Sequence, residues 1–159
     1  MINIYNIDCL EAMQDMKDNQ YDLAIVDPPY GIGDFRNLYS RERHKKIEWN
    51  NDIPSEEYFH HLYRITKNRI IFGCNYFSPY IKDKGRIVHD KTGGGHRNFP
   101  KQLSDCDIAS HSFGINMKIY HYTSCGNVIG NKIDWNNTMK WHPCQKPIQL
   151  YKWILQNYA

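Results

Sequence analysis

A four-residue motif, Asp-Pro-Pro-Tyr at 27–30, carries groups that can hold an amine. A carboxylate and a backbone carbonyl, kept rigid by two prolines, can accept both hydrogens of an exocyclic amine on a base. A tyrosine ring can stack on that base, and such stacking is worth about 1–3 kcal/mol. The same residues also fit a simple Pro-Pro turn after a strand, with the tyrosine packed in the core. The motif alone leaves both interpretations open.

Acceptors of this kind can assist a reaction at the amine nitrogen. The lone pair of an aryl amine is delocalised into the ring, which makes the nitrogen a poor nucleophile. Hydrogen bonds that favour the pyramidal amine make the lone pair available as the transition state forms. They therefore stabilise the transition state more than the ground state.

Strands and helices alternate around the motif. Residues 21–26 form a compact apolar run that must end at Asp27, because the prolines that follow cannot donate to a strand ladder. Helices are predicted after Asp8, Ser55 and Pro147. The sequence also predicts strands at 2–5, 69–72 and 86–90, and a late β-hairpin from 106–109 and 117–122. This order predicts an α/β sheet with helices on both faces, with the motif at the edge where such sheets bind ligands.

Length and composition limit the class of protein. The chain has 159 residues, of which 41% are hydrophobic and 23% charged, which fits one folded domain. Apolar runs stay well below the ~20 residues that cross a bilayer, and the N-terminus has no signal-peptide pattern. We therefore expect a cytoplasmic protein with no membrane partner.

The five cysteines are expected to be reduced thiols, because their number is odd and no Cys-x-x-Cys pair occurs. His121 with Cys125 and His142 with Cys144 are the nearest zinc candidates. Neither pair has a matching second pair, so no metal site is predicted.

Positive charge is concentrated in one loop. The net charge is only +3, but residues 36–46 hold five basic side chains against a single acid, Glu42. Such a loop is typical either of phosphate contact or of an ordinary solvated surface. The basic residues are Arg36, Arg41, Arg43, Lys45 and Lys46.

Four segments, in the right order, resemble the S-adenosylmethionine-dependent amino-methyltransferases that modify adenine N6 or cytosine N4 in DNA. The first is the motif at 27–30, and the second is Gly-Cys-Asn-Tyr-Phe at 73–77, similar to the family's Gly-x-Asn-Tyr-Phe turn. The third is similar to the family's Trp-Asp-Lys strand with Glu-Leu-Ala downstream, although His89 replaces the tryptophan and Asp107 the glutamate. The fourth, at 142–147, is close to His-Pro-Thr-Gln-Lys-Pro. Together they cover essentially the whole chain.

The resemblance implies a partial Rossmann-like methyltransferase sheet and gives the motif a role. The flipped target base would be bound, and methyl transfer driven without a covalent enzyme intermediate, by Asp27, Pro28, Pro29 and Tyr30. An initial aspartate favours adenine N6, since serine is usual in the cytosine enzymes. Base flipping costs a few kcal/mol. The basic loop would help to offset this cost by contacting the phosphates of double-stranded DNA.

The implied cofactor is S-adenosylmethionine. Asp8 resembles the acid that contacts its adenosine end, whereas His142, Gln145 and Lys146 resemble the segment that lines its methionine end. Asp8 fits a helix N-cap equally well, and Lys146 also fits a solvated side chain at the start of a helix. Glycines at 31, 33 and 93–95 are weak signals for a phosphate-binding loop.

The motif order is that of the family's β group, in which the main cofactor glycine loop comes last. That loop would follow Lys146, but the sequence ends at Ala159 before it appears. Residues 1–159 are thus expected to be the target-base-binding part of one domain, incomplete at its C-terminal end. The absent strands would separate 2–5 from 21–26. We therefore expect strand 21–26 to present an unpaired edge, through which the chain dimerises or its N-terminal strand rearranges.

The leading hypothesis is thus part of a DNA adenine N6-methyltransferase, with this chain alone weakly active or inactive. A non-catalytic remnant that binds DNA or a partner is the main alternative. Protein glutamine or RNA substrates fit less well, because those relatives usually carry Asn in place of Asp27. A cognate endonuclease of a restriction-modification pair is a further candidate partner.

Overall fold

Alternating side chains of the first strand pack into two separate hydrophobic layers. In the computed structural model, which describes residues 2–33, 50–95, 104–125, 128–130 and 144–159, β1 spans Tyr21–Val26. Ala24 and Val26 pack against one core cluster, and Leu23 and Ile25 pack against another. Since side chains alternate along a strand, the two clusters lie on opposite faces of the sheet.

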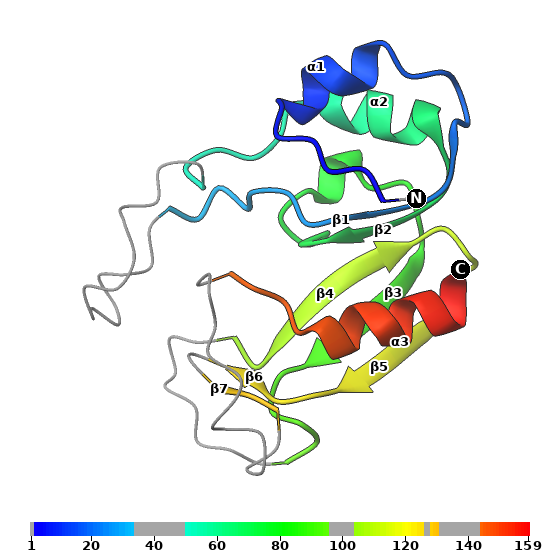
Figure 1. Cartoon of the computed structure of the whole chain (residues 1–159). Coiled ribbons are helices and arrows are strands. Elements are labelled where there is room, and N and C mark those ends of the chain that lie inside the picture. Colours follow the sequence, from blue (N-terminus) through cyan, green and yellow to red (C-terminus); the bar gives the residue numbers. More distant parts are fainter. Residues whose placement is uncertain (1, 34–49, 96–103, 126–127, 131–143) are drawn as a thin grey trace.

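Five strands form a mixed sheet in the order β1-β2-β4-β3-β5 (Figure 1). β1 and β2 are parallel, as are β3 and β5, whereas β4 runs antiparallel between β2 and β3. A separate two-stranded sheet joins β6 (Ser124–Cys125) to β7 (Val128–Ile129). The remaining strands are β2 (Thr66–Phe72), β3 (Gly85–Asp90), β4 (Cys106–His111) and β5 (Met117–His121).

Helices cover both faces of the sheet, as the sequence predicts (Figure 1). α1 (Cys9–Gln14) and α2 (Glu56–Ile65) begin after the predicted caps Asp8 and Ser55. Their apolar side chains pack on one face around Phe59 and Ile71. On the other face, α3 (Ile148–Tyr158) buries Leu150 and Ile154 against β2, β3 and β4. A short 3₁₀ turn at Ser78–Tyr80 completes the described elements.

The predicted late hairpin is wrong. β4 and β5 do not pair with each other, because β3 lies between them, antiparallel to β4 and parallel to β5. Hydrophobic alternation identifies a strand but not its partner. Here, insertion of β3 between two neighbours buries Ile87 and His89 completely on the face of α3, which an edge position would not achieve.

The predicted strand at 2–5 is also wrong. These residues have no strand conformation, and the side chains of Ile2 and Ile4 are each 90% exposed. An alternating pattern makes a strand only where a neighbour supplies backbone partners. β1 is the last strand at its end of the sheet, as expected, and among the described residues no strand pairs with its outer edge.

Where the structure describes the chain, no helix is both long and apolar enough to span a membrane. Within the same residues, no group of three or more His, Cys, Asp and Glu side chains is arranged to hold a metal ion.

The burial of α3 gives a stability prediction. Ile154→Ala should lower the free energy of unfolding by about 2–5 kcal/mol, because it leaves a cavity in a fully buried position. Leu155→Ala on the same helix is the control, since Leu155 is 49% exposed and should cost at most about 1 kcal/mol. Urea titration of both variants measures the difference. Equal losses would mean that α3 does not pack on the sheet in this orientation.

Candidate functional site

Asp27 lies directly after β1, at the edge of the sheet where the parallel strands end. The turn that follows is fixed by Asn50, which is only 3% exposed. The Asn50 side-chain oxygen accepts a hydrogen bond from the Tyr30 backbone N–H at 2.8 Å, and its side-chain nitrogen donates to the Gly33 carbonyl at 2.9 Å. Gly33 N–H returns a bond of 2.9 Å to the Asn50 carbonyl. One buried amide therefore holds both ends of the turn that presents the motif.

The ring of Tyr30 is partly buried among other aromatic rings. It stacks on Tyr76 with centroids 4.9 Å apart and meets the edge of Phe77 at 5.9 Å. Gly73, at φ +72°, lies so close that a Cβ there would be 2.3 Å from the Tyr30 ring. This contact and the left-handed backbone both call for glycine at the turn after β2. The packing directs the Tyr30 hydroxyl to Asp27, where it donates to Oδ1 at 2.5 Å.

Lys146 completes this cluster from the other end of the chain. Its ammonium donates to Asp27 Oδ1 and Oδ2 at 3.1 and 2.9 Å, and to the Tyr30 hydroxyl oxygen at 3.1 Å. Only 8% of the Lys146 side chain is exposed, compared with 26% of the Asp27 side chain. Lys146 precedes Pro147, the N-cap of α3, so the packing of α3 on the sheet places the ammonium at the motif.

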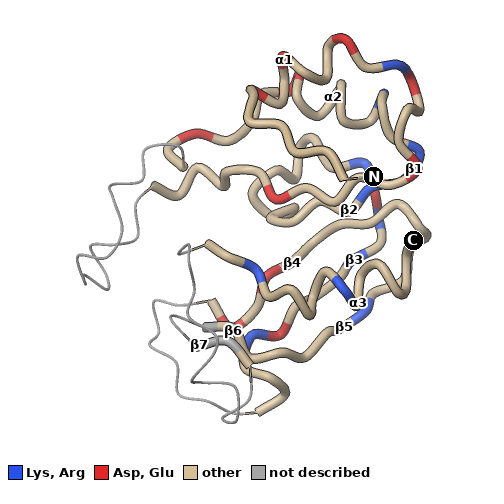
Figure 2. Tube along the Cα trace, viewed as in Figure 1, with Lys and Arg blue, Asp and Glu red and all other residues tan. Residues whose placement is uncertain are grey.

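A second carboxylate lies beside the cluster, at the start of β4. Asp107 Oδ1 accepts a hydrogen bond from Lys91 at 3.0 Å, and its Oδ2 lies 3.6 Å from Nδ1 of the buried His89. Because β4 is antiparallel to its neighbours, its first residues share an edge with the last residues of β3. Figure 2 shows acidic and basic positions side by side near the start of β4.

The pKa values follow from these contacts. Burial and the Asp27 carboxylate raise the pKa of Tyr30 well above its usual value, so the phenol stays protonated and can donate. Burial alone would lower the pKa of Lys146, but Asp107 and Asp27 more than offset it and the pKa is raised. Burial opposes ionisation of Asp107, yet His89, Lys146 and Lys91 bring its pKa below the usual range. The Asp107 carboxylate and the Lys146 ammonium are therefore held in their charged forms.

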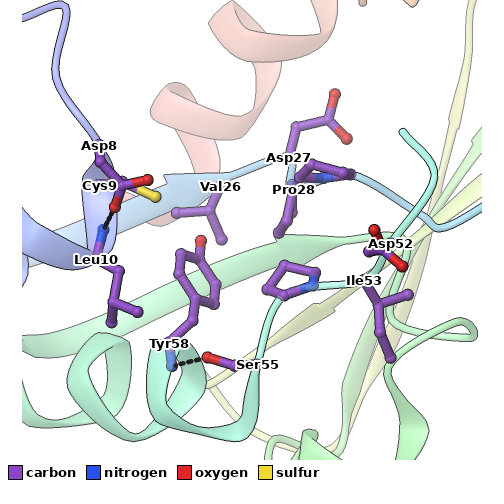
Figure 3. A pocket seen from close by; sticks show the side chains of 12 residues that line it. Asp8, Cys9, Leu10, Val26, Asp27, Pro28, Asp52, Ile53, Ser55 and Tyr58 are labelled. Carbon is purple, nitrogen blue, oxygen red and sulfur yellow. Dashed lines mark hydrogen bonds between the residues drawn. The ribbon is translucent and has the colours of Figure 1, made fainter. Parts of the chain in front are cut away.

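A cavity of about 530 Å³ adjoins Asp27 on the side of α1 and α2. Figure 3 shows Asp8 and Cys9 at one end, Asp52 and Ile53 at the other, and Tyr58 between them. The Asp27 carboxylate points away from Tyr58, toward the side of α3. The volume of the cavity lies within the range of small-molecule sites, which is about 300–1,000 Å³. Leu10, Val26, Pro28, Pro29, Pro54 and Ser55 also line it.

Most of the predicted site residues that the structure describes lie at this edge. Asp27, Tyr30 and Lys146 are in direct contact, while Pro28 and Pro29 line the cavity. Gln145 directly precedes Lys146. Lys146 is not the solvated side chain that the sequence also allowed. The predicted residues outside the described part of the chain are Arg36, Arg41, Arg43, Lys45, Lys46 and His142.

Asp8 is the N-cap that one of the two interpretations predicted. Its Oδ1 accepts hydrogen bonds from the backbone N–H groups of Leu10 and Glu11 at 2.8 and 3.2 Å. It lines the cavity as well, so capping does not exclude contact with a ligand.

Sequence reasoning missed Asn50 and the role of Asp107. Asn50 belongs to no motif, so only the folded turn reveals it. Asp107 had a signal, because the resemblance matched it to a glutamate. The strand pattern did not predict that β4 lies antiparallel between β2 and β3. This position brings Asp107 to the edge of the sheet where Asp27 lies.

Neither protein-family models nor curated proteins give a match to this sequence.

The glycine-rich loop after β3 is organised by one carboxylate. Asp90 accepts hydrogen bonds from the Thr92 N–H and hydroxyl at 2.7 and 2.6 Å and from the Gly94 N–H at 2.9 Å, and His121 Nδ1 lies 2.7 Å away. Two of the amides that a phosphate-binding loop would need are therefore used internally. Although burial opposes ionisation, these donors lower the pKa of Asp90 to about 2.

This pKa predicts how stability depends on pH. The Asp90 pKa is lowered from its ordinary 3.8, so its contribution to stability is present above that value and lost as pH falls toward about 2. Asp90→Asn should therefore be less stable than the wild type at pH 6. The difference in the free energy of unfolding between the two should narrow between about pH 5 and pH 3. Urea midpoints across this range measure this difference. Thr92→Val, which keeps the carboxylate, should differ less in stability from the wild type. A stability difference for Asp90→Asn that does not change with pH would contradict the lowered pKa of Asp90.

Proposed function

We propose that the chain is the target-base-binding and catalytic part of an S-adenosylmethionine-dependent DNA methyltransferase that acts on adenine N6. One observation carries this proposal. The Asp27 carboxylate and the Tyr30 hydroxyl converge on a nitrogen donor, the Lys146 ammonium, beside a cavity large enough for a small molecule. A site that accepts hydrogen bonds from one nitrogen can accept them from another.

The roles of the residues follow from their chemistry. The Asp27 carboxylate accepts hydrogen bonds from the base amine and favours its pyramidal form, which exposes the nitrogen lone pair. Protonated Tyr30 donates to the same carboxylate and keeps it oriented. The prolines fix the backbone after β1, since neither has an N–H that would extend the strand. Binding and orientation are thus built into a rigid turn, as catalysis by positioning requires.

The cavity fits the proposed cofactor in charge and size. Asp8 and Asp52 contribute acidic side chains to its lining, which suits the sulfonium cation and the ribose hydroxyls of S-adenosylmethionine. When bound, the cofactor supplies the methyl group. Asp8 would hold its adenosine end, and the segment at Gln145 and Lys146 would lie near its methionine end.

DNA is proposed as the substrate on the strength of the resemblance. Phosphate contacts are assigned to the basic residues between 36 and 46. The outer edge of β1 is the proposed place for strands that complete the sheet, whether from a second copy or from further chain, because backbone groups on an edge strand favour pairing.

The catalytic role of Asp27 can be tested by methyl transfer. Asp27→Asn should lower transfer from radiolabelled S-adenosylmethionine to unmethylated DNA by at least roughly a hundredfold, because the charged acceptor is lost. The matched control is Asp22→Asn in β1, the strand that leads to Asp27, because Asp22 bonds only the exposed Lys67 at 2.7 Å among the contacts described. Activity retained in Asp27→Asn would exclude the mechanism. DNA binding without any transfer by the wild type would favour the non-catalytic remnant.

The cofactor role of Asp8 can be separated from its capping role. Asparagine caps helices as well as aspartate does, so Asp8→Asn should leave stability within about 0.5 kcal/mol of the wild type. Its affinity for S-adenosylmethionine should nevertheless fall by about tenfold, because a charge-assisted bond becomes a neutral one. Calorimetric titration and thermal denaturation measure the two effects. Unchanged affinity would mean that Asp8 acts only as the N-cap of α1.

A further inference from the structure

The acceptors at the motif are occupied by a residue of the protein itself. An ammonium has three N–H donors, and three acceptor atoms surround that of Lys146, namely both Asp27 carboxylate oxygens and the Tyr30 hydroxyl. The Lys146 side chain is almost completely buried. The nitrogen donor for which Asp27 and Tyr30 are arranged is therefore present in the free chain.

We propose that the Lys146 ammonium is an internal occupant of the amine-binding position, which an external amine can take only after the lysine side chain has moved away. The inference rests on the proposed function in one respect, that Asp27 binds an amine of the substrate. It adds that the free chain is closed by its own lysine, so that binding is an exchange of one nitrogen for another.

A displaced Lys146 does not lose its counter-charge. Asp107 also acts on the lysine and, with Asp27, keeps its pKa raised despite burial. Lys91 and His89 already contact Asp107, so Asp107 belongs to a polar cluster that can take up another donor. The four-carbon stem of lysine can rotate without movement of the backbone. Exchange therefore avoids the large cost of a buried, unpaired ammonium.

The acceptors also define the class of ligand. Asp27 can only accept hydrogen bonds, and the Tyr30 hydroxyl hydrogen is already donated to Asp27. A group that replaces Lys146 must therefore bring hydrogen-bond donors, as an amine does. Adenine and cytosine carry an exocyclic amine, whereas thymine presents a carbonyl oxygen at the corresponding position. The cluster should thus admit amino-bearing bases and exclude thymine.

Removal of the lysine side chain should open the position to a small amine. Lys146→Ala deletes three carbons and the nitrogen, which n-propylammonium replaces atom for atom. We expect n-propylammonium chloride to raise the Tm of Lys146→Ala in a saturable manner and to have no such effect on the wild type. Sodium chloride at equal ionic strength controls for salt.

Two further variants test the location. Lys67→Ala removes the exposed lysine that pairs with Asp22 and should not respond to n-propylammonium. The double variant Lys146→Ala/Asp27→Asn should lose the response, because the charged acceptor is gone. A response that survives Asp27→Asn, or its absence in folded Lys146→Ala, would overturn the proposal.

The wild-type chain gives a second test, which holds even if Lys146→Ala does not fold. Acetylation by sulfo-NHS-acetate, followed by mass spectrometry, should modify Lys146 at least about tenfold more slowly than Lys67. Saturating 2′-deoxyadenosine should accelerate modification of Lys146, and thymidine should not. Equal rates for the two lysines would overturn the proposal.

The two proposals fail in different ways. A protected Lys146 that n-propylammonium replaces in the variant, but 2′-deoxyadenosine does not release in the wild type, would support the internal occupant and contradict adenine as the ligand. Methyl transfer to adenine with a freely acetylated Lys146 would support the proposed function and contradict the internal occupant.

Discussion

The contact between Asp27 and Lys146 is the constraint around which the described structure is organised. A charged pair that is largely removed from water is stable only when geometry and further hydrogen bonds offset desolvation. The Tyr30 hydroxyl provides one such bond, and the second carboxylate at Asp107 supplies further favourable charge. Asn50, Gly73 and the packing of α3 act indirectly, because each fixes a segment that delivers one of these groups.

The topology explains why so many polar groups reach one edge. Parallel strands end at the same edge, so β1 brings Asp27 and β2 leads to the glycine turn under Tyr30. β4 runs the other way and contributes its first residues to that edge. Both faces beneath are covered by helices, which keeps the sheet apolar up to the point where the charges begin. The polar cluster is thereby placed on a rigid base.

Sequence periodicity predicted the local elements better than their pairing. The caps at Asp8 and Ser55 and the run 21–26 were confirmed, since capping and apolar patterns act over a few residues. The hairpin and the strand at 2–5 were wrong because pairing depends on partners distant in sequence. The same difference between local and long-range information applies to the site residues. The motif at 27–30 is visible as a local pattern, whereas Asn50 and the contact of Asp27 with Lys146 depend on the complete fold.

Asp27 and Lys146 are separated by 119 positions in the sequence. Closure of so long a loop is entropically expensive, and contacts between distant residues tend to form late in folding. During synthesis on a ribosome, the motif emerges long before its lysine, and Asp27 remains solvated until α3 has docked. The cluster of Asp27, Tyr30 and Lys146 is therefore a late product of folding, and a chain trapped in a partly folded state would have the motif without these contacts.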